Sequence, residues 1–134
     1  MATRHQSREA VVGLLYAHDI GNKEIDNFAS DILEEKKIRH RQKEFALNLY
    51  TNTISNIETI DSKINNYLKE WKVDEIGNIE RAILRLGAYE LLFTDTDSAV
   101  IINEAIELSK ELASDTSPKF INAVLDSLKK EKSS

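Results

Sequence analysis

The sequence predicts an all-α fold, a compact bundle of six to seven helices, and three observations support this prediction. Helix-breaking residues are scarce, since the 134 residues include one Pro and four Gly. Residues that favour helices, namely Leu, Ile, Glu, Lys and Ala, are abundant. Apolar residues recur three and four positions apart, and no segment alternates apolar and polar residues as a half-buried strand would.

The first predicted helix begins near residue 3 and ends before Gly21. Thr3 and Gln6 have the spacing of a capping box, in which each side chain bonds the backbone of the other residue. The residues that then recur at helical spacing are Ala10, Val11, Leu14, Leu15 and His18. Gly21 with Asn22 is typical of a helix end.

A second helix is expected near residues 25–36, with Phe28, Ile32 and Leu33 facing inward. The basic segment KKIRHRQK, residues 36–43, follows it. We interpret this segment as a hinge before the third helix.

The third helix is expected over residues 42–57. Apolar residues at positions 60, 64 and 68 continue the helical period, with Asp61 or Ser62 as a new cap. Trp71 and Val73 then lie in a connection.

The segment IGNIERAILRLGAYELLF, residues 76–93, is apolar around most of a helical circumference. Arg81 and Arg85 are its main polar strip. A helix this apolar is normally central, with other helices packed around it.

Two more helices complete the predicted bundle. Ser98 is expected to cap the first, and Pro118 occupies a first helical position in the second, where its missing N–H costs nothing. The final residues, KKEKSS, are expected to fray.

Size and composition indicate a single globular domain, residues 1–134. The chain has no Cys and no apolar run long enough to span a membrane, and no hydrophobic signal-type stretch follows its first residues, so we expect a cytoplasmic protein. A net charge of −5 counts against a general affinity for nucleic acid. Any nucleic-acid site must therefore be a local patch, helped by a partner.

No motif indicates catalysis, a cofactor or a metal. The four Gly are scattered, and His5, His18 and His40 lack the spacing of helical metal ligands. We therefore expect no enzyme activity. Glu90 falls on the apolar stripe of the central helix, where an unpaired carboxylate would be costly, so we expect a structural hydrogen bond to a neighbouring helix start or polar side chain.

Cations lie at two helix starts that would favour carboxylates. Arg4, His5 and Arg8 fall in the first two turns of the first helix, and Lys119 lies at the start of the last. The helix dipole disfavours a cation there by about 0.3–1 kcal/mol. If a phosphate bound at the helix start, the cation would instead be favourable, because it and the free backbone N–H groups would face the same anion. The alternative, that these are ordinary exposed side chains paired with neighbours such as Glu9, stays open.

Aromatic residues accompany both groups of cations. Tyr16 shares a stripe of the first helix with His5 and Arg8, and Phe120 follows Lys119. Such rings stack unpaired bases in proteins that bind single-stranded RNA.

Three segments resemble the NusB family of bacterial transcription antitermination factors: SREAVVGLLYAHD, NIERAILRLGAYELLF and AVIINEAIELSKELASDTSPKFINAVLDSL. The resemblance covers nearly the whole chain in the family's order. It implies a fold of two small helical subdomains, roughly 1–60 and 61–134.

The resemblance also implies a function without catalysis. NusB proteins pair with NusE, a small-subunit ribosomal protein, and the pair binds the single-stranded boxA element of nascent ribosomal RNA. With other Nus factors, this makes RNA polymerase resistant to termination. Some family members form homodimers and others are monomeric, so a homodimer is possible.

Site residues follow from the family's pattern. Arg4, Arg8 and Tyr16 match positions of its arginine-rich first helix, in which His5 and Gln6 replace arginines. The remaining matches are Lys119 and Phe120 for RNA, and Tyr67 and Glu80 for NusE. With fewer cations than the family's denser arginine run, the chain is expected to bind RNA weakly unless NusE is present.

Two alternatives come from other classes. One is a helical adaptor that contacts only proteins, its basic helix starts meeting an acidic partner. The other is the RNA-binding module of an RNA methyltransferase, which the absence of a dinucleotide-type motif disfavours.

Overall fold

Helices make up most of residues 2–133, the part of the chain that the computed structural model describes, with side chains given for residues 2–131. In chain order the elements are α1 (Arg4–Asp19), α2 (Ile25–Glu35), α3 (Arg41–Ser55), α4 (Ile57–Asn65), the short 3-10 helix η1 (Val73–Glu75), α5 (Asn78–Phe93), α6 (Ser98–Leu112) and α7 (Ser117–Ser133). Every regular element in this part of the chain is helical, so the predicted all-α class is confirmed.

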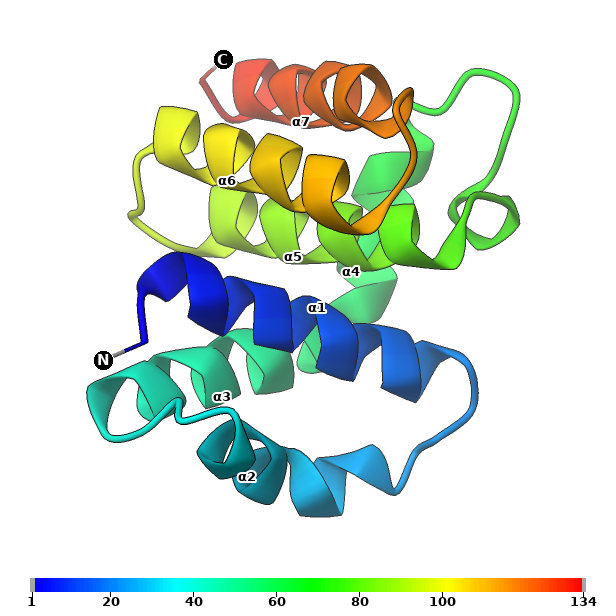
Figure 1. The fold of residues 1–134 in the computed structure, drawn as a ribbon. Coiled ribbons are helices and arrows are strands. Elements are labelled where there is room, and N and C mark those ends of the chain that lie inside the picture. Colours follow the sequence, from blue (N-terminus) through cyan, green and yellow to red (C-terminus); the bar gives the residue numbers. More distant parts are fainter. Residues whose placement is uncertain (1, 134) are drawn as a thin grey trace.

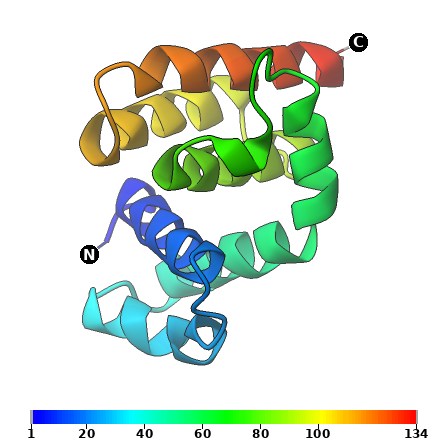
Figure 2. The same ribbon diagram turned by 90° about the vertical axis from the view of Figure 1, so that its right-hand side faces the viewer.

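Helix α5 lies at the centre of the molecule, as its sequence predicts. It packs against α1, α3, α4, α6 and α7, and residues 81–91 are all buried. Figure 1 shows it within a stack of helices, with α6 and α7 above it and α1, α3 and α2 below. Helix α4 stands across this stack at one side and connects its lower and upper parts (Figure 2). A single hydrophobic cluster runs through the helices of both parts.

The basic segment between α2 and α3 is a tight connection. The Lys37 N–H donates to the Glu34 carbonyl and the Ile38 N–H to the Leu33 carbonyl, both at 2.9 Å. This pair of bonds is the Schellman motif that commonly closes a helix. Lys37 and His40 both have positive φ, 62° and 56°, a region that L-residues other than Gly seldom occupy.

The break between the third and fourth helices differs from the prediction. It falls at Asn56, and α4 begins at Ile57, upstream of the expected caps at positions 61 and 62. The Asn56 side-chain amide donates to the Asn52 carbonyl at 2.7 Å, a local bond with which asparagine interrupts a helix. Asp61 therefore lies inside α4.

Phe28 does not face inward as predicted, since 53% of it is exposed. The buried face of α2 consists of Ile25, Ala29 and Leu33, spaced four residues apart. Phe28 lies about 100° away from Ala29 on that helix and points outward.

Arg81 and Arg85 are buried, whereas the sequence predicted a polar strip. The Arg81 Nε donates to Asp19 Oδ2 at 2.8 Å, and Arg85 donates through Nε and Nη2 to both oxygens of Asp61, also at 2.8 Å. Arg85 Nη1 reaches Asp19 Oδ1 at 3.1 Å. The network joins the end of α1 to α4 and α5.

Two predictions for the C-terminal helices are wrong. Asp97, not Ser98, caps α6, because its carboxylate accepts the Ala99 N–H at 2.8 Å. Residues 129–133 were expected to fray but continue α7, held by Glu131, which accepts from Lys63 Nζ at 2.5 Å and from the Tyr67 hydroxyl. Ser134 lies outside the described residues.

Within residues 2–133, none of the helices combines the length and the apolar character that crossing a membrane requires.

Candidate functional site

The predicted capping box at the start of α1 is confirmed. The Gln6 N–H donates to Thr3 Oγ1 at 3.0 Å, and the Thr3 N–H donates to Gln6 Oε1 at 2.9 Å. The first turn, residues 4–7, contains no acidic residue. No carboxylate of the first turn therefore offsets the positive end of the helix dipole.

Arg4 is exposed and lies against α3. Its guanidinium carbon is 4.5 Å from the centroid of the Phe45 ring, a cation–π contact that holds the side chain in place. Among the described residues the guanidinium forms no ion pair, so its N–H groups face solvent. An exposed guanidinium of this kind can donate two parallel hydrogen bonds to a phosphate.

His5 is held between two carboxylates of α6. Its Nδ1 lies 2.5 Å from Glu104 Oε2, and its Nε2 lies 2.9 Å from Glu111 Oε1. The hydrogen bond to Glu104, with that to Glu111, raises the pKa of His5 against the opposing effect of burial. Both ring nitrogens are occupied, so His5 in this arrangement joins α1 to α6 and has no nitrogen left for RNA.

One group of side chains could hold a metal ion, and it consists of His5, Glu9 and Glu111. One ligand atom from each of them lies within 4.8 Å of the other two. The spacing of histidines in the sequence did not indicate this group. Its members come from two helices, and His5 and Glu111 are 106 positions apart.

Arg8 does not lie on the surface, which corrects its expected contact with RNA. Only 3% of it is exposed, and its Nε and Nη2 donate to both carboxylate oxygens of Glu90 at 2.9 and 2.8 Å. The prediction that Glu90 has a structural hydrogen-bonding partner is thereby confirmed. The cation at this position neutralises a buried carboxylate of the central helix.

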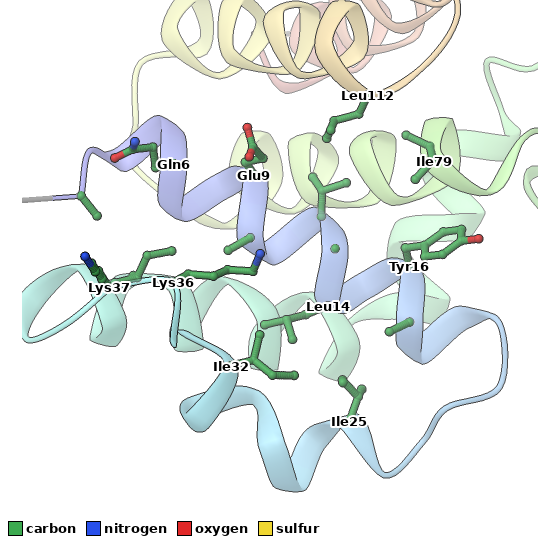
Figure 3. Close-up of a pocket in the computed structure, with 16 residues that line it drawn as sticks. Gln6, Glu9, Leu14, Tyr16, Ile25, Ile32, Lys36, Lys37, Ile79 and Leu112 are labelled. Carbon is green, nitrogen blue, oxygen red and sulfur yellow. The ribbon is translucent and has the colours of Figure 1, made fainter. Parts of the chain in front are cut away.

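A groove of about 750 Å³ runs along the outer face of α1 (Figure 3). Tyr16 is half-buried at one end, near Leu112 and Ile79, while Lys36 and Lys37 lie toward the other. Its remaining lining residues are Ala2, Gln6, Glu9, Ala10, Val12, Gly13, Leu14, Ala17, Ile25, Ile32 and Ile38. The sequence marked the two lysines only as part of a basic hinge, because their place beside α1 depends on how α2 packs.

Lys119 is exposed and Phe120 is half-buried at the start of α7. Phe120 borders a shallow pocket of about 280 Å³ together with Trp71, Gly77 and Glu80. Helix α1 starts at the left of Figure 1 and α7 starts at the right. The two predicted RNA elements therefore do not meet.

Tyr67 and Glu80 contact opposite ends of α7. The Tyr67 hydroxyl donates to Glu131, and Glu80 Oε2 accepts from Ser117 Oγ at 2.7 Å. Position 131 is fourteen residues after position 117, a distance of about 21 Å along a helix axis. A partner that touches both residues must follow this edge of the molecule.

Comparison with known proteins agrees with this architecture. The sequence model of the NusB family matches residues 5–130. Over 131 residues the chain is 62% identical to the transcription antitermination protein NusB of a Nitratiruptor species, and the match covers 98% of this chain and 94% of that relative.

Solved structures are similar over the same extent. T. maritima NusB has a TM-score of 0.85 at 34% identity, covering 97% of this chain and 92% of that one. A NusB chain from the crystal structure of the antitermination factors NusB and NusE in complex with dsRNA has a TM-score of 0.86 at 30% identity, covering 96% of each chain. With the family model, the near relative and the shared fold in agreement, the chain belongs to the NusB family.

Proposed function

We propose that this chain is a non-enzymatic transcription antitermination factor that binds the single-stranded boxA element of nascent ribosomal RNA together with NusE. The observation that carries the proposal is its likeness, over 96% of the chain, to a NusB crystallised with NusE and dsRNA. Its role in the larger antitermination complex, with RNA polymerase and other Nus factors, is part of the same proposal.

Exposed side chains supply the chemistry of RNA binding. Arg4 and Lys119 contribute charge for phosphates, and the half-buried rings of Tyr16 and Phe120 offer faces for unpaired bases. Arg8 is left out because its guanidinium is buried against Glu90.

Charge explains why a partner is needed. The chain carries a net charge of −5, and Glu104 and Glu111 lie beside the start of α1. Unaided binding is therefore weak, and NusE adds contacts along the edge marked by Tyr67 and Glu80. Glu80 is half-buried with one oxygen bonded to Ser117, so its other oxygen is the acceptor for a NusE donor.

The proposal is tested by fluorescence anisotropy of a labelled boxA-type RNA, titrated with the chain alone and with NusE. NusE is expected to tighten binding, and Arg4→Glu with Lys119→Glu to weaken it. Each lost phosphate contact lowers the salt slope of log K by about 0.7 for a single strand. Lys23→Glu, at an exposed lysine between α1 and α2, is the matched control and leaves binding unchanged.

Two results would contradict the proposal. If the double variant kept the affinity and the salt slope of the wild type, the strand would lie elsewhere. If the chain bound NusE but added nothing to RNA affinity, the adaptor hypothesis would replace RNA binding.

A further inference from the structure

The start of α1 and the end of α6 bring one imidazole and two carboxylates together at the surface. His5 and Glu9 are four residues apart in α1, so their side chains lie on the same face of the helix. Glu111 comes from α6, and it completes a group whose ligand atoms lie within 4.8 Å of one another. Imidazole nitrogen and carboxylate oxygen are both ligands of Zn²⁺ in proteins. The three side chains are therefore a ligand set for this ion.

A fourth side chain orients the imidazole. The Nδ1 of His5 lies 2.5 Å from Glu104 Oε2, and its Nε2 lies 2.9 Å from Glu111 Oε1. In metal sites a histidine ligand almost always donates its other ring N–H to a carboxylate, a backbone carbonyl or water, which fixes the ring and makes the ligand nitrogen more basic. Glu104 is placed to accept from Nδ1, so Nε2 is the nitrogen that faces the ligand carboxylates.

Glu9 is the carboxylate of this group without a partner. Its side chain is exposed, and it forms no hydrogen bond or ion pair with the residues that the structure describes. Its carboxylate is directed toward α6 (Figure 3). Together with Glu104 and Glu111, three carboxylates share one imidazole, and like charges this close repel one another. A divalent cation between Glu9 and Glu111 would offset that repulsion.

The distances and the exposure of the group suit a small cation. Four ligand atoms that surround Zn²⁺ at about 2.0–2.2 Å lie about 3.3–3.6 Å from one another. The separation of His5 Nε2 and Glu111 Oε1 is 2.9 Å, so a small rotation of these side chains admits the ion. The exposed fractions of the two side chains, 28% and 42%, leave the group open to solvent. Water can therefore supply the remaining ligand.

We propose that His5 Nε2, Glu9 and Glu111 bind one Zn²⁺ ion, with Glu104 orienting the imidazole and water completing the coordination. The ion takes the place of the proton on Nε2, which is released to solvent, and the two ligand carboxylates balance its charge. Helix α1 packs mainly against α2, α3 and α5, whereas α6 packs mainly against α5 and α7. The ion therefore links two helices whose main packing partners are other helices. This inference is independent of RNA binding.

Isothermal titration calorimetry with zinc chloride tests the proposal on the full chain, prepared without a histidine tag. The wild type is expected to bind one Zn²⁺ per chain. His5→Gln, Glu9→Gln and Glu111→Gln each remove a ligand, and each is expected to weaken zinc binding by more than about tenfold. Glu104→Gln removes the positioning carboxylate and keeps all three ligands, so a loss of about tenfold is expected.

Thermal unfolding gives a second readout. Zinc is expected to raise the Tm of the wild type, because a ligand that binds only the folded state stabilises it, and EDTA is expected to reverse the rise. His5→Gln also loses its bonds to α6, so its Tm without zinc is expected to be lower. The quantity compared is therefore the difference in Tm with and without zinc for each variant. This difference is expected to vanish in His5→Gln and Glu111→Gln.

Two control variants remove the same chemical groups elsewhere. His18→Gln removes an imidazole near the end of α1, and Glu58→Gln removes an exposed carboxylate of α4. Both are expected to bind zinc with the wild-type affinity and to keep the zinc-dependent rise in Tm.

Three results would overturn the inference. The first is a wild type that takes up no zinc. The second is wild-type zinc affinity in both His5→Gln and Glu111→Gln, because the ion would then lie outside this group. The third is a loss in His18→Gln as large as that in His5→Gln, which would place the ion at the other histidine. None of these results bears on the proposed function, since the RNA titrations test it separately.

Discussion

Arg8 and His5 show how burial decides what a charged side chain does. The sequence places both at a helix start beside Arg4, where all three have the same apparent chemistry. In the fold, Arg8 turns inward to Glu90, and His5 is occupied by Glu104 and Glu111. Arg4 alone of the three keeps its donors exposed.

Removing either partner of the Arg8–Glu90 pair is expected to destabilise the protein strongly. Arg8→Gln leaves the Glu90 carboxylate buried without its counter-charge, and Glu90→Gln does the same to the guanidinium. Breaking a buried ion pair in this way costs about 3–5 kcal/mol. Urea unfolding measures the loss, and Arg4→Gln, a change at an exposed arginine one turn earlier, should stay within about 0.5 kcal/mol. Equal effects of Arg4→Gln and Arg8→Gln would show that burial of the pair does not matter.

At the scale of elements, a glycine of α5 leaves room for a leucine of α7. A Cβ at Gly87 would lie 2.9 Å from Leu125 Cδ1 and 3.2 Å from its Cδ2, inside the core between α5 and α7. Gly13 of α1, by contrast, lies at an open position, where an added Cβ would meet no heavy atom within 4 Å. One glycine is needed for packing and the other is not.

Gly87→Ala is therefore expected to destabilise the fold, because the methyl group forces Leu125 out of its packed position. The cost of overpacking, about 1–3 kcal/mol, exceeds the gain of about 1 kcal/mol in helix propensity. Gly13→Ala keeps only the gain and serves as the control. Chemical unfolding of both variants tests this, and a Gly87→Ala protein more stable than the wild type would contradict it.

At the scale of the whole molecule, the network of Asp19 with Arg81 and Arg85 ties the lower helices to the upper ones. Asp19 comes from the end of α1, and both arginines come from α5. Burial disfavours the Asp19 carboxylate, but the hydrogen bonds from the two arginines outweigh it, and the pKa of Asp19 is lowered. Ionised Asp19 therefore stabilises the folded state.

The sign of this pKa shift predicts a pH dependence. A carboxyl with a lowered pKa stabilises the fold fully above its unfolded pKa of about 3.9 and loses that contribution as pH falls through its folded pKa. Asp19→Asn is expected to cost about 1–3 kcal/mol at neutral pH, and the difference from the wild type should shrink in acid. Urea unfolding across the acid range measures it, with the exposed Asp31→Asn as control. A difference that persists unchanged below the folded pKa would rule out the charge as its origin.

The sequence by itself determined the helical class, the central place of α5 and the cap of α1. Helical periodicity and capping depend on residues three or four positions apart, so they can be recognised in the chain before it folds. The helix break at Asn56 was mispredicted because the bond from its side chain to the Asn52 carbonyl leaves a weaker sequence pattern than helical periodicity does. The outward position of Phe28 was mispredicted because the sequence pattern does not fix which face of α2 packs inward.

Only the tertiary structure decided which of the predicted site residues are available. Arg8 and Glu90 are 82 positions apart, and Lys37 reaches the groove because α2 folds back along α1. The burial and pairing of a side chain depend on groups that are distant in the chain, so a local sequence pattern cannot reveal them. For this reason the sequence could place positive charge at the start of α1, whereas the fold determined that Arg4 faces solvent and that Arg8 neutralises the core.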